Sequence, residues 1–147
     1  MSADLALGAS PLVIGFLAGR ASPAVQTSAP GVPPGAVFGI AWTILYAGLG
    51  VVLVRAVRRV RAQPSALATA ILAVLTVHLV LNFSWTAAFA QSATTGLYVI
   101  AAVLATALSL LGLASSVDPW SGGIVGIYIG WLIFALTLNY GELVTNR

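Results

Sequence analysis

The chain has 147 residues, of which 60% are hydrophobic and 6% are charged, and its formal net charge is +3. A soluble domain is about 45–50% apolar and about 25% charged, and one of this size could not bury so much apolar surface. The composition argues against a soluble enzyme, a disordered chain and a nucleic-acid-binding protein, and it predicts an integral membrane protein. Because cysteine is absent, disulfides, thiolate metal sites and thiol nucleophiles are excluded.

Five stretches are long and apolar enough to cross a bilayer, which takes about 20 residues in a helix. Prolines mark a loop over residues 21–35, polar residues from Gln91 to Gly96 interrupt a long uncharged stretch, and Asp118-Pro119 precedes the last span. In chain order, the predicted spans are residues 5–20, 36–57, 65–90, 96–115 and 120–144. The sequence therefore predicts an all-α membrane protein in which a bundle of five transmembrane helices forms one domain over residues 1–147.

The first span has the length of a signal peptide, which is the alternative interpretation of this segment. Asp4 precedes it and no basic residue does, and this counts against cleavage.

Arginine placement predicts the orientation of the bundle. With five spans, one side holds Arg55, Arg58, Arg59 and Arg61, and the other side holds Arg20 and Arg147. The positive-inside rule then places the N-terminus in the cytoplasm. We expect a multi-pass protein of a bacterial plasma membrane, with an outer membrane as the alternative.

Aromatic and polar residues form a stripe on three of the predicted helices. Residues three or four apart share a helix face, so the aromatic and polar residues of each of these helices point in one direction. Polar groups that would be costly against lipid should turn inward. If the stripes converge, they enclose an aromatic cavity suited to a large, flat, apolar ligand. The candidate ligand-binding residues are Phe38, Trp42, Tyr46, His78, Asn82, Trp85, Tyr128, Trp131, Ala135 and Asn139.

Each stripe also has a purely structural interpretation. Tryptophans often form interfacial belts, and Asn82 could link two helices by a hydrogen bond. His78, the single histidine, either satisfies a buried neighbour or ligates haem iron. No metal site, hydrolytic triad or phosphate-binding loop is expected. Gly15 and Gly19 form a GxxxG pattern, which favours close helix packing and is compatible with a homodimer.

Four segments resemble motifs of the TspO family, the tryptophan-rich sensory proteins that include the mitochondrial translocator protein. Residues 33–46 (PPGAVFGIAWTILY) resemble PPxxxFxxxWxxLY, and residues 81–89 (LNFSWTAAF) resemble LNxxWsxxFF with an alanine for one phenylalanine. Residues 128–135 (YIGWLIFA) resemble YxxWxxFA, and Leu138-Asn139 with Asn146 resembles the last motif. Four matches in order, on a chain of this length, make the resemblance specific.

The resemblance implies a five-helix bundle, commonly a homodimer, that binds tetrapyrroles such as protoporphyrin IX or haem and, in some members, sterols. It implies that Trp42 and Trp131 match tryptophans of the pocket that are also implicated in porphyrin degradation, and that Asn82 and Trp85 match pocket positions. The usual aromatic residues and lysine of the first loop are missing here, so Arg20 is left as the cation near the pocket. The sterol pattern also fails, because six residues separate Tyr140 from Arg147.

We therefore expect a membrane protein that binds porphyrin-like ligands in an aromatic cavity, for sensing or transport, with no required cofactor. One alternative is an enzyme that degrades porphyrin in light, with Trp42 and Trp131 as its catalytic residues. The other is a structural or partner-binding membrane protein whose pocket has degenerated. The expected partners are the lipid bilayer, a tetrapyrrole-like molecule, a second copy of the chain and, with little support, a sterol; no nucleic acid is expected.

Overall fold

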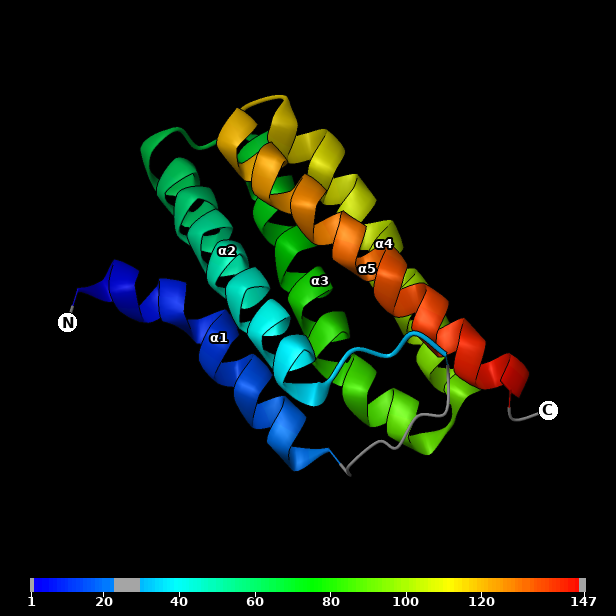
Figure 1. The fold of residues 1–147 in the computed structure, drawn as a ribbon. Helices are drawn as coiled ribbons and strands as arrows, with labels where there is room; N and C mark the ends of the chain where they lie inside the picture. Colours follow the sequence, from blue (N-terminus) through cyan, green and yellow to red (C-terminus); the bar gives the residue numbers. More distant parts are fainter. Residues whose placement is uncertain (1, 23–29, 146–147) are drawn as a thin grey trace.

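A computed structural model describes residues 2–22 and 30–145 of the chain. Most of the first loop lies outside the described residues, and so do Asn146 and Arg147, which the sequence analysis named. The described residues form five helices and contain no strand (Figure 1): α1 (Ala3–Ala21), α2 (Gly35–Ala62), α3 (Ala66–Gln91), α4 (Ala93–Ser115) and α5 (Pro119–Thr145). All five are long and apolar enough to cross a membrane. The prediction of an all-α bundle of five membrane-spanning helices is confirmed.

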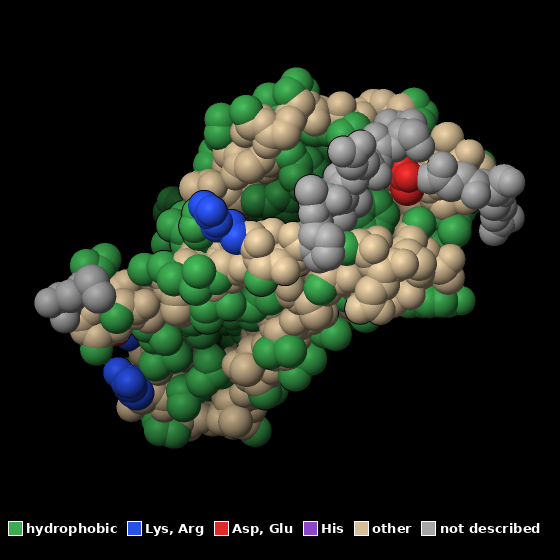
Figure 2. All heavy atoms as spheres, turned by 90° about the horizontal axis from the view of Figure 1, so that it is seen from below, with side chains coloured by type: hydrophobic (Ala, Val, Ile, Leu, Met, Phe, Trp, Pro, Cys, Tyr) green, Lys and Arg blue, Asp and Glu red, His purple; other side chains and the backbone are tan. Residues whose placement is uncertain are grey.

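The packing of the bundle is tightest among the last three helices. Helix α4 lies between α3 and α5, α2 packs against both α3 and α5, and α1 packs on α2 and α3 (Figure 1). Small and branched apolar residues such as Ile100, Ala107 and Leu132 fill the interior. Large apolar side chains such as Ile44 and Ile127 point outward, and the face shown in Figure 2 carries few charged side chains. Such an exterior suits acyl chains rather than water.

Helix α2 continues past residue 57, where the sequence predicted its end, as far as Ala62. No proline or glycine interrupts the arginine-rich segment before Pro64, and its arginines have partners on other parts of the bundle. Arg58 forms an ion pair with Asp4 of α1 at 2.7 Å, and Nη1 of Arg59 donates to the carbonyl oxygen of Val117 at 3.1 Å. The arginine cluster therefore joins the end of α2 to α1 and to the segment before α5.

Arg55 makes the strongest of these contacts. Its Nε and Nη2 donate to the two carboxylate oxygens of Asp118 at 2.6 and 2.7 Å, a two-pronged pairing that fixes geometry as well as charge. The hydroxyl of Ser121 donates to the same carboxylate at 2.6 Å. Asp118 thus ties α2 to the start of α5. Together with Arg58 and Asp4, this pair fastens one end of the bundle.

Helices α3 and α4 are joined by Ser92 alone. The N–H of Ser92 donates to the carbonyl oxygen of Ala88, and its side chain accepts from the N–H of Thr95, so one residue caps both helices. The sequence analysis expected an interruption that extended to Gly96. Gly96 instead lies in the first turn of α4, where its missing side chain lets the backbone of Phe89 approach closely.

Helix α1 meets α2 most closely at two glycines. A side chain on Gly50 would collide with the backbone of Gly8, and one on Gly15 would collide with the ring of Tyr46. A Cβ added to Gly19, the second glycine of the GxxxG pattern, would meet no atom within 4 Å, so Gly19 does not support this contact. Pro11 lies inside α1, and Figure 1 shows this helix changing direction along its length, as a proline removes a helical hydrogen bond.

We predict that Gly50→Ala separates α1 from α2. The added methyl group meets the backbone of Gly8, which cannot rotate away as a side chain could, so we expect a loss of about 1–3 kcal/mol of stability. Thermal unfolding in detergent measures it, with Gly130→Ala as the matched control because a Cβ there meets no neighbour. Equal melting temperatures for the two variants would contradict the close contact.

We also predict an acid-sensitive contribution from Asp118. Hydrogen bonding from Arg55 holds the pKa of the Asp118 carboxyl well below its usual range. A carboxyl whose pKa is lowered by folding stabilises the protein above its unfolded pKa of about 3.9, and this stabilisation is lost as pH falls. Asp118→Asn should therefore melt below the wild type at pH 7, and the difference should shrink as the pH is lowered through the acidic range. A difference that is independent of pH would contradict the ion pair.

Candidate functional site

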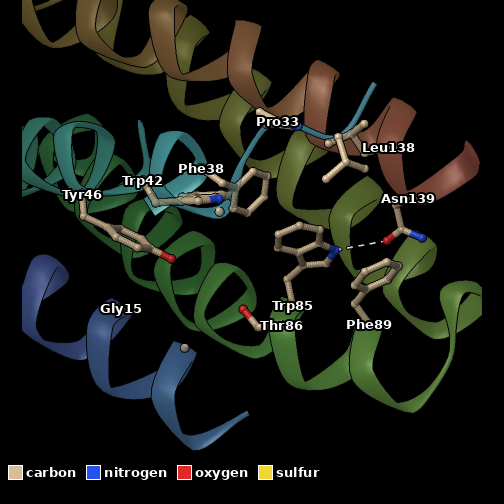
Figure 3. Close-up of a pocket in the computed structure, with 13 residues that line it drawn as sticks. Gly15, Pro33, Phe38, Trp42, Tyr46, Trp85, Thr86, Phe89, Leu138 and Asn139 are labelled. Carbon is tan, nitrogen blue, oxygen red and sulfur yellow. Dashed lines mark hydrogen bonds between the residues drawn. The ribbon is translucent and has the colours of Figure 1, made fainter. Parts of the chain in front are cut away.

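A cavity of about 490 Å³ lies in the half of the bundle next to the first loop, away from the ion pairs of Arg55 and Arg58. Aromatic rings of α2 and α3 form most of its wall, and described residues of the first loop cover it (Figure 3). The lining residues are Gly15, Gly19, Val32, Pro33, Gly35, Phe38, Trp42, Tyr46, Trp85, Thr86, Phe89, Leu138 and Asn139. Four helices and the loop therefore contribute to one hollow.

Trp42 is the centre of the aromatic cluster. Its ring centroid lies 5.3 Å from that of Tyr46, 5.9 Å from Trp85 and 6.3 Å from Trp131. It also contacts Phe38 and Tyr128, at 6.2 and 6.5 Å. Aromatic pairs at such separations stabilise one another beyond their burial. The stripes of α2, α3 and α5 therefore converge on this one indole.

Asn139 of α5 supports the wall of the cavity through two hydrogen bonds. Its side-chain oxygen accepts from Nε1 of Trp85 at 3.2 Å, the dashed line in Figure 3, and its amide nitrogen donates to the carbonyl oxygen of Ala93 at 2.7 Å. The ring of Phe89 stacks on Trp85 with centroids 5.9 Å apart. Asn139 thus fixes the orientation of the Trp85 indole at the cavity surface.

His78 is fully buried and hydrogen-bonded at both ring nitrogens. Nδ1 lies 2.8 Å from the hydroxyl of Thr106, and Nε2 lies 2.9 Å from the hydroxyl of Tyr128. The Thr106 hydroxyl donates its proton to a backbone carbonyl of its own helix, so it accepts from Nδ1–H and leaves Nε2 to accept from Tyr128. His78 therefore links α3, α4 and α5 and has no nitrogen left for haem iron. The described residues contain no cluster of three potential metal ligands.

The buried polar groups of Asn82 and Trp131 lack hydrogen-bond partners among the described residues, unlike those of His78 and Asn139. Asn82 is 1% exposed, yet neither its amide nitrogen nor its oxygen has a hydrogen-bond partner among the described residues. The same holds for Nε1 of Trp131. An unpaired buried polar group costs about 1–3 kcal/mol. Such groups in a native fold require an explanation beyond packing.

The five helices and their aromatic cavity belong to a known family. A model of the TspO/MBR family matches residues 7–144, nearly the whole chain. The chain belongs to the TspO/MBR family. No curated protein matches it at a significant level. The match extends over α1 to α5, so it includes every helix that lines the cavity.

The cavity of this TspO/MBR protein divides the residues expected from the sequence into two groups. Phe38, Trp42, Tyr46, Trp85 and Asn139 line it, whereas His78, Asn82, Tyr128, Trp131 and Ala135 do not. Within the second group, the ring of Trp131 packs on that of Phe38 with centroids 5.5 Å apart, and Ala135 is fully buried. A stripe on a helix face thus contained both lining and supporting residues.

Other lining residues were not expected from the sequence. Phe89 continues the α3 stripe one turn beyond Trp85 and could have been named from its spacing. Thr86 and Leu138 lie beside stripe residues and carry no signal of their own. Val32 and Pro33 cover the cavity from the described part of the first loop with apolar groups.

We predict that Tyr128→Phe destabilises the bundle. Removal of the hydroxyl leaves Nε2 of His78 unpaired at full burial, and an interhelical hydrogen bond in a membrane contributes about 0.6–2 kcal/mol. Thermal unfolding in detergent measures this loss. Tyr98→Phe is the control, because the Tyr98 side chain is exposed. If both variants melt like the wild type, the His78 network does not stabilise the fold.

Proposed function

We propose that this TspO/MBR membrane protein binds a flat, hydrophobic ligand of the porphyrin class in its aromatic cavity, for sensing or transport. The observation that carries the proposal is Asn82, whose buried amide has no partner among the described residues. A side chain kept for packing alone would be replaced at less cost by an apolar one of similar shape. Asn82 is therefore explained best as a group that pairs with a ligand.

The size and lining of the cavity support this proposal. Small-molecule sites are mostly apolar and have volumes of about 300–1,000 Å³, and the volume here is about 490 Å³. Rings of Phe38, Trp42, Tyr46, Trp85 and Phe89 offer flat surfaces from two helices (Figure 3). Stacking on such rings favours a planar macrocycle over a flexible chain.

The position of Trp42 connects the cavity with the unpaired groups. Its ring packs on Trp131, whose N–H has no partner among the described residues, and on Trp85, which lies one helical turn after Asn82. Trp131 is thus in contact with a wall residue and Asn82 is one helical turn from another, so a ligand in the cavity would have to displace part of the wall to pair with them. Asn82 offers a donor and an acceptor and Trp131 a donor, which suits a planar ligand with nitrogen or carbonyl groups at its edge.

The degradation hypothesis requires both Trp42 and Trp131 beside the porphyrin. Trp42 lines the cavity and Trp131 does not. Binding for sensing or transport is the simpler proposal, because it needs no redox role for Trp131.

We predict opposite effects for two asparagine variants. Asn82→Leu removes unpaired polar atoms, so it should raise the melting temperature and weaken protoporphyrin IX binding about tenfold, the value of one lost hydrogen bond. Asn139→Leu should lower the melting temperature, because it leaves the Trp85 N–H unpaired and removes the link from Asn139 to the Ala93 carbonyl at the start of α4. Thermal unfolding and titration of the porphyrin absorption band measure the two effects.

Trp42→Phe completes this experiment, because it shortens the ring that contacts Trp85 and Trp131. Binding of protoporphyrin IX should weaken while the helical circular dichroism stays unchanged. If Asn82→Leu and Trp42→Phe both bind the porphyrin as tightly as the wild type, the assignment of the cavity is wrong. If the wild type shows no saturable binding, the ligand class is wrong.

A further inference from the structure

A second hollow, of about 560 Å³, lies between α1 and α2 and is here called the α1–α2 groove. Apolar side chains of α1 form one wall, and the other wall, formed by α2, includes the small residues Gly39 and Thr43. Phe16 and Leu17 on the first wall are exposed, so the groove faces the lipid side of these helices. Its lining includes Leu12, Phe16, Leu17, Arg20, Gly39 and Thr43.

The groove results from the way α1 approaches α2. The two helices touch through backbone at Gly8 and Gly50, and Pro11 follows within α1. Further along, Gly19 and Gly39 have no neighbouring atoms within 4 Å of an added Cβ. The missing side chains therefore leave a space that no described residue fills.

A positive charge lies at one end of this groove. The guanidinium carbon of Arg20 lies 5.5 Å from the centroid of the Phe16 ring, and both residues line the groove. The ion pairs among the described residues join Arg55 to Asp118 and Arg58 to Asp4. Arg20 takes part in neither pair, so its charge is available to an anion.

The length of the groove matches one lipid leaflet. From Leu12 to Arg20 the helix rises about 12 Å at about 1.5 Å per residue, somewhat less than half of a hydrocarbon core about 30 Å thick. The apolar lining therefore covers a length comparable to one leaflet and ends at the cation of Arg20. This arrangement suits one acyl chain of a lipid together with an anionic group at the Arg20 end.

We propose that the α1–α2 groove binds one acyl chain of an anionic phospholipid, whose phosphate contacts Arg20. Trp42, Tyr46, Gly15 and Gly19 line both this groove and the cavity. The bound chain therefore forms part of the outer wall of the ligand site. The inference does not depend on porphyrin binding, since it rests on a different hollow and a different charge.

Quenching of tryptophan fluorescence by brominated lipids tests the proposal. All proteins carry Trp120→Phe, because Trp120 is 77% exposed and would be quenched by any lipid. The protein is placed in phosphatidylcholine–phosphatidylglycerol vesicles in which one or the other lipid is brominated. We expect brominated phosphatidylglycerol to reach half-maximal quenching at a fraction about fivefold lower than brominated phosphatidylcholine does, which is the effect of one arginine near an anionic lipid.

Two pairs of variants distinguish the contribution of the Arg20 charge to lipid binding from that of the space in the groove. Arg20→Gln should abolish the preference for phosphatidylglycerol, whereas Arg61→Gln, which removes an arginine from the end of α2 that carries the ion pairs, should keep it. Gly39→Leu fills the groove and should abolish most quenching by both lipids. Gly130→Leu is its control, because Gly130 is an exposed glycine of α5 with equally free space that does not line the groove.

Three results would overturn the proposal. The first is equal quenching by the two brominated lipids in the protein with Arg20 intact. The second is unchanged quenching in Gly39→Leu. The third is the absence of quenching by either lipid together with cross-linking of α1 between two chains, which would show that a second copy occupies the groove.

Discussion

The packing of Trp42 is the contact on which the site depends. Its indole touches rings from α2, α3 and α5, so it fixes the spacing of three helices that otherwise meet through small and branched side chains. Because so large a ring cluster fills the centre without filling the end of the bundle, a hollow remains between the cluster and the first loop. The other end is closed by the ion pairs of Arg55 and Arg58.

Buried polar groups serve two different purposes in this bundle. His78 and Asn139 each make two hydrogen bonds to other helices, so they hold the structure together. Asn82 lies on the same face of α3 as His78 and is equally buried, but it makes none with the described residues. Two similar residues on one helix face thus differ in whether their hydrogen-bonding capacity is used within the fold.

The sequence predicted the five helices, because uncharged stretches of membrane length and the breaks between them follow from composition. It also predicted three stripes of aromatic and polar residues, because residues spaced by one helical turn share a face. Spacing could not separate Trp42, which lines the cavity, from Trp131, which supports it, since this depends on how the helices rotate against each other. The partners of the arginines and the role of Gly96 depend on contacts between distant segments, which no local pattern contains.

The joint at Ser92 determines how much chain is accessible at one face of the membrane. A single residue links α3 to α4, and its backbone and side chain are both hydrogen-bonded. A protease needs several residues of extended chain to cleave, and here none are offered. The two helices therefore form a hairpin that resists nicking, and an epitope or a fusion partner inserted at this position would have to unwind a helix before it could be displayed.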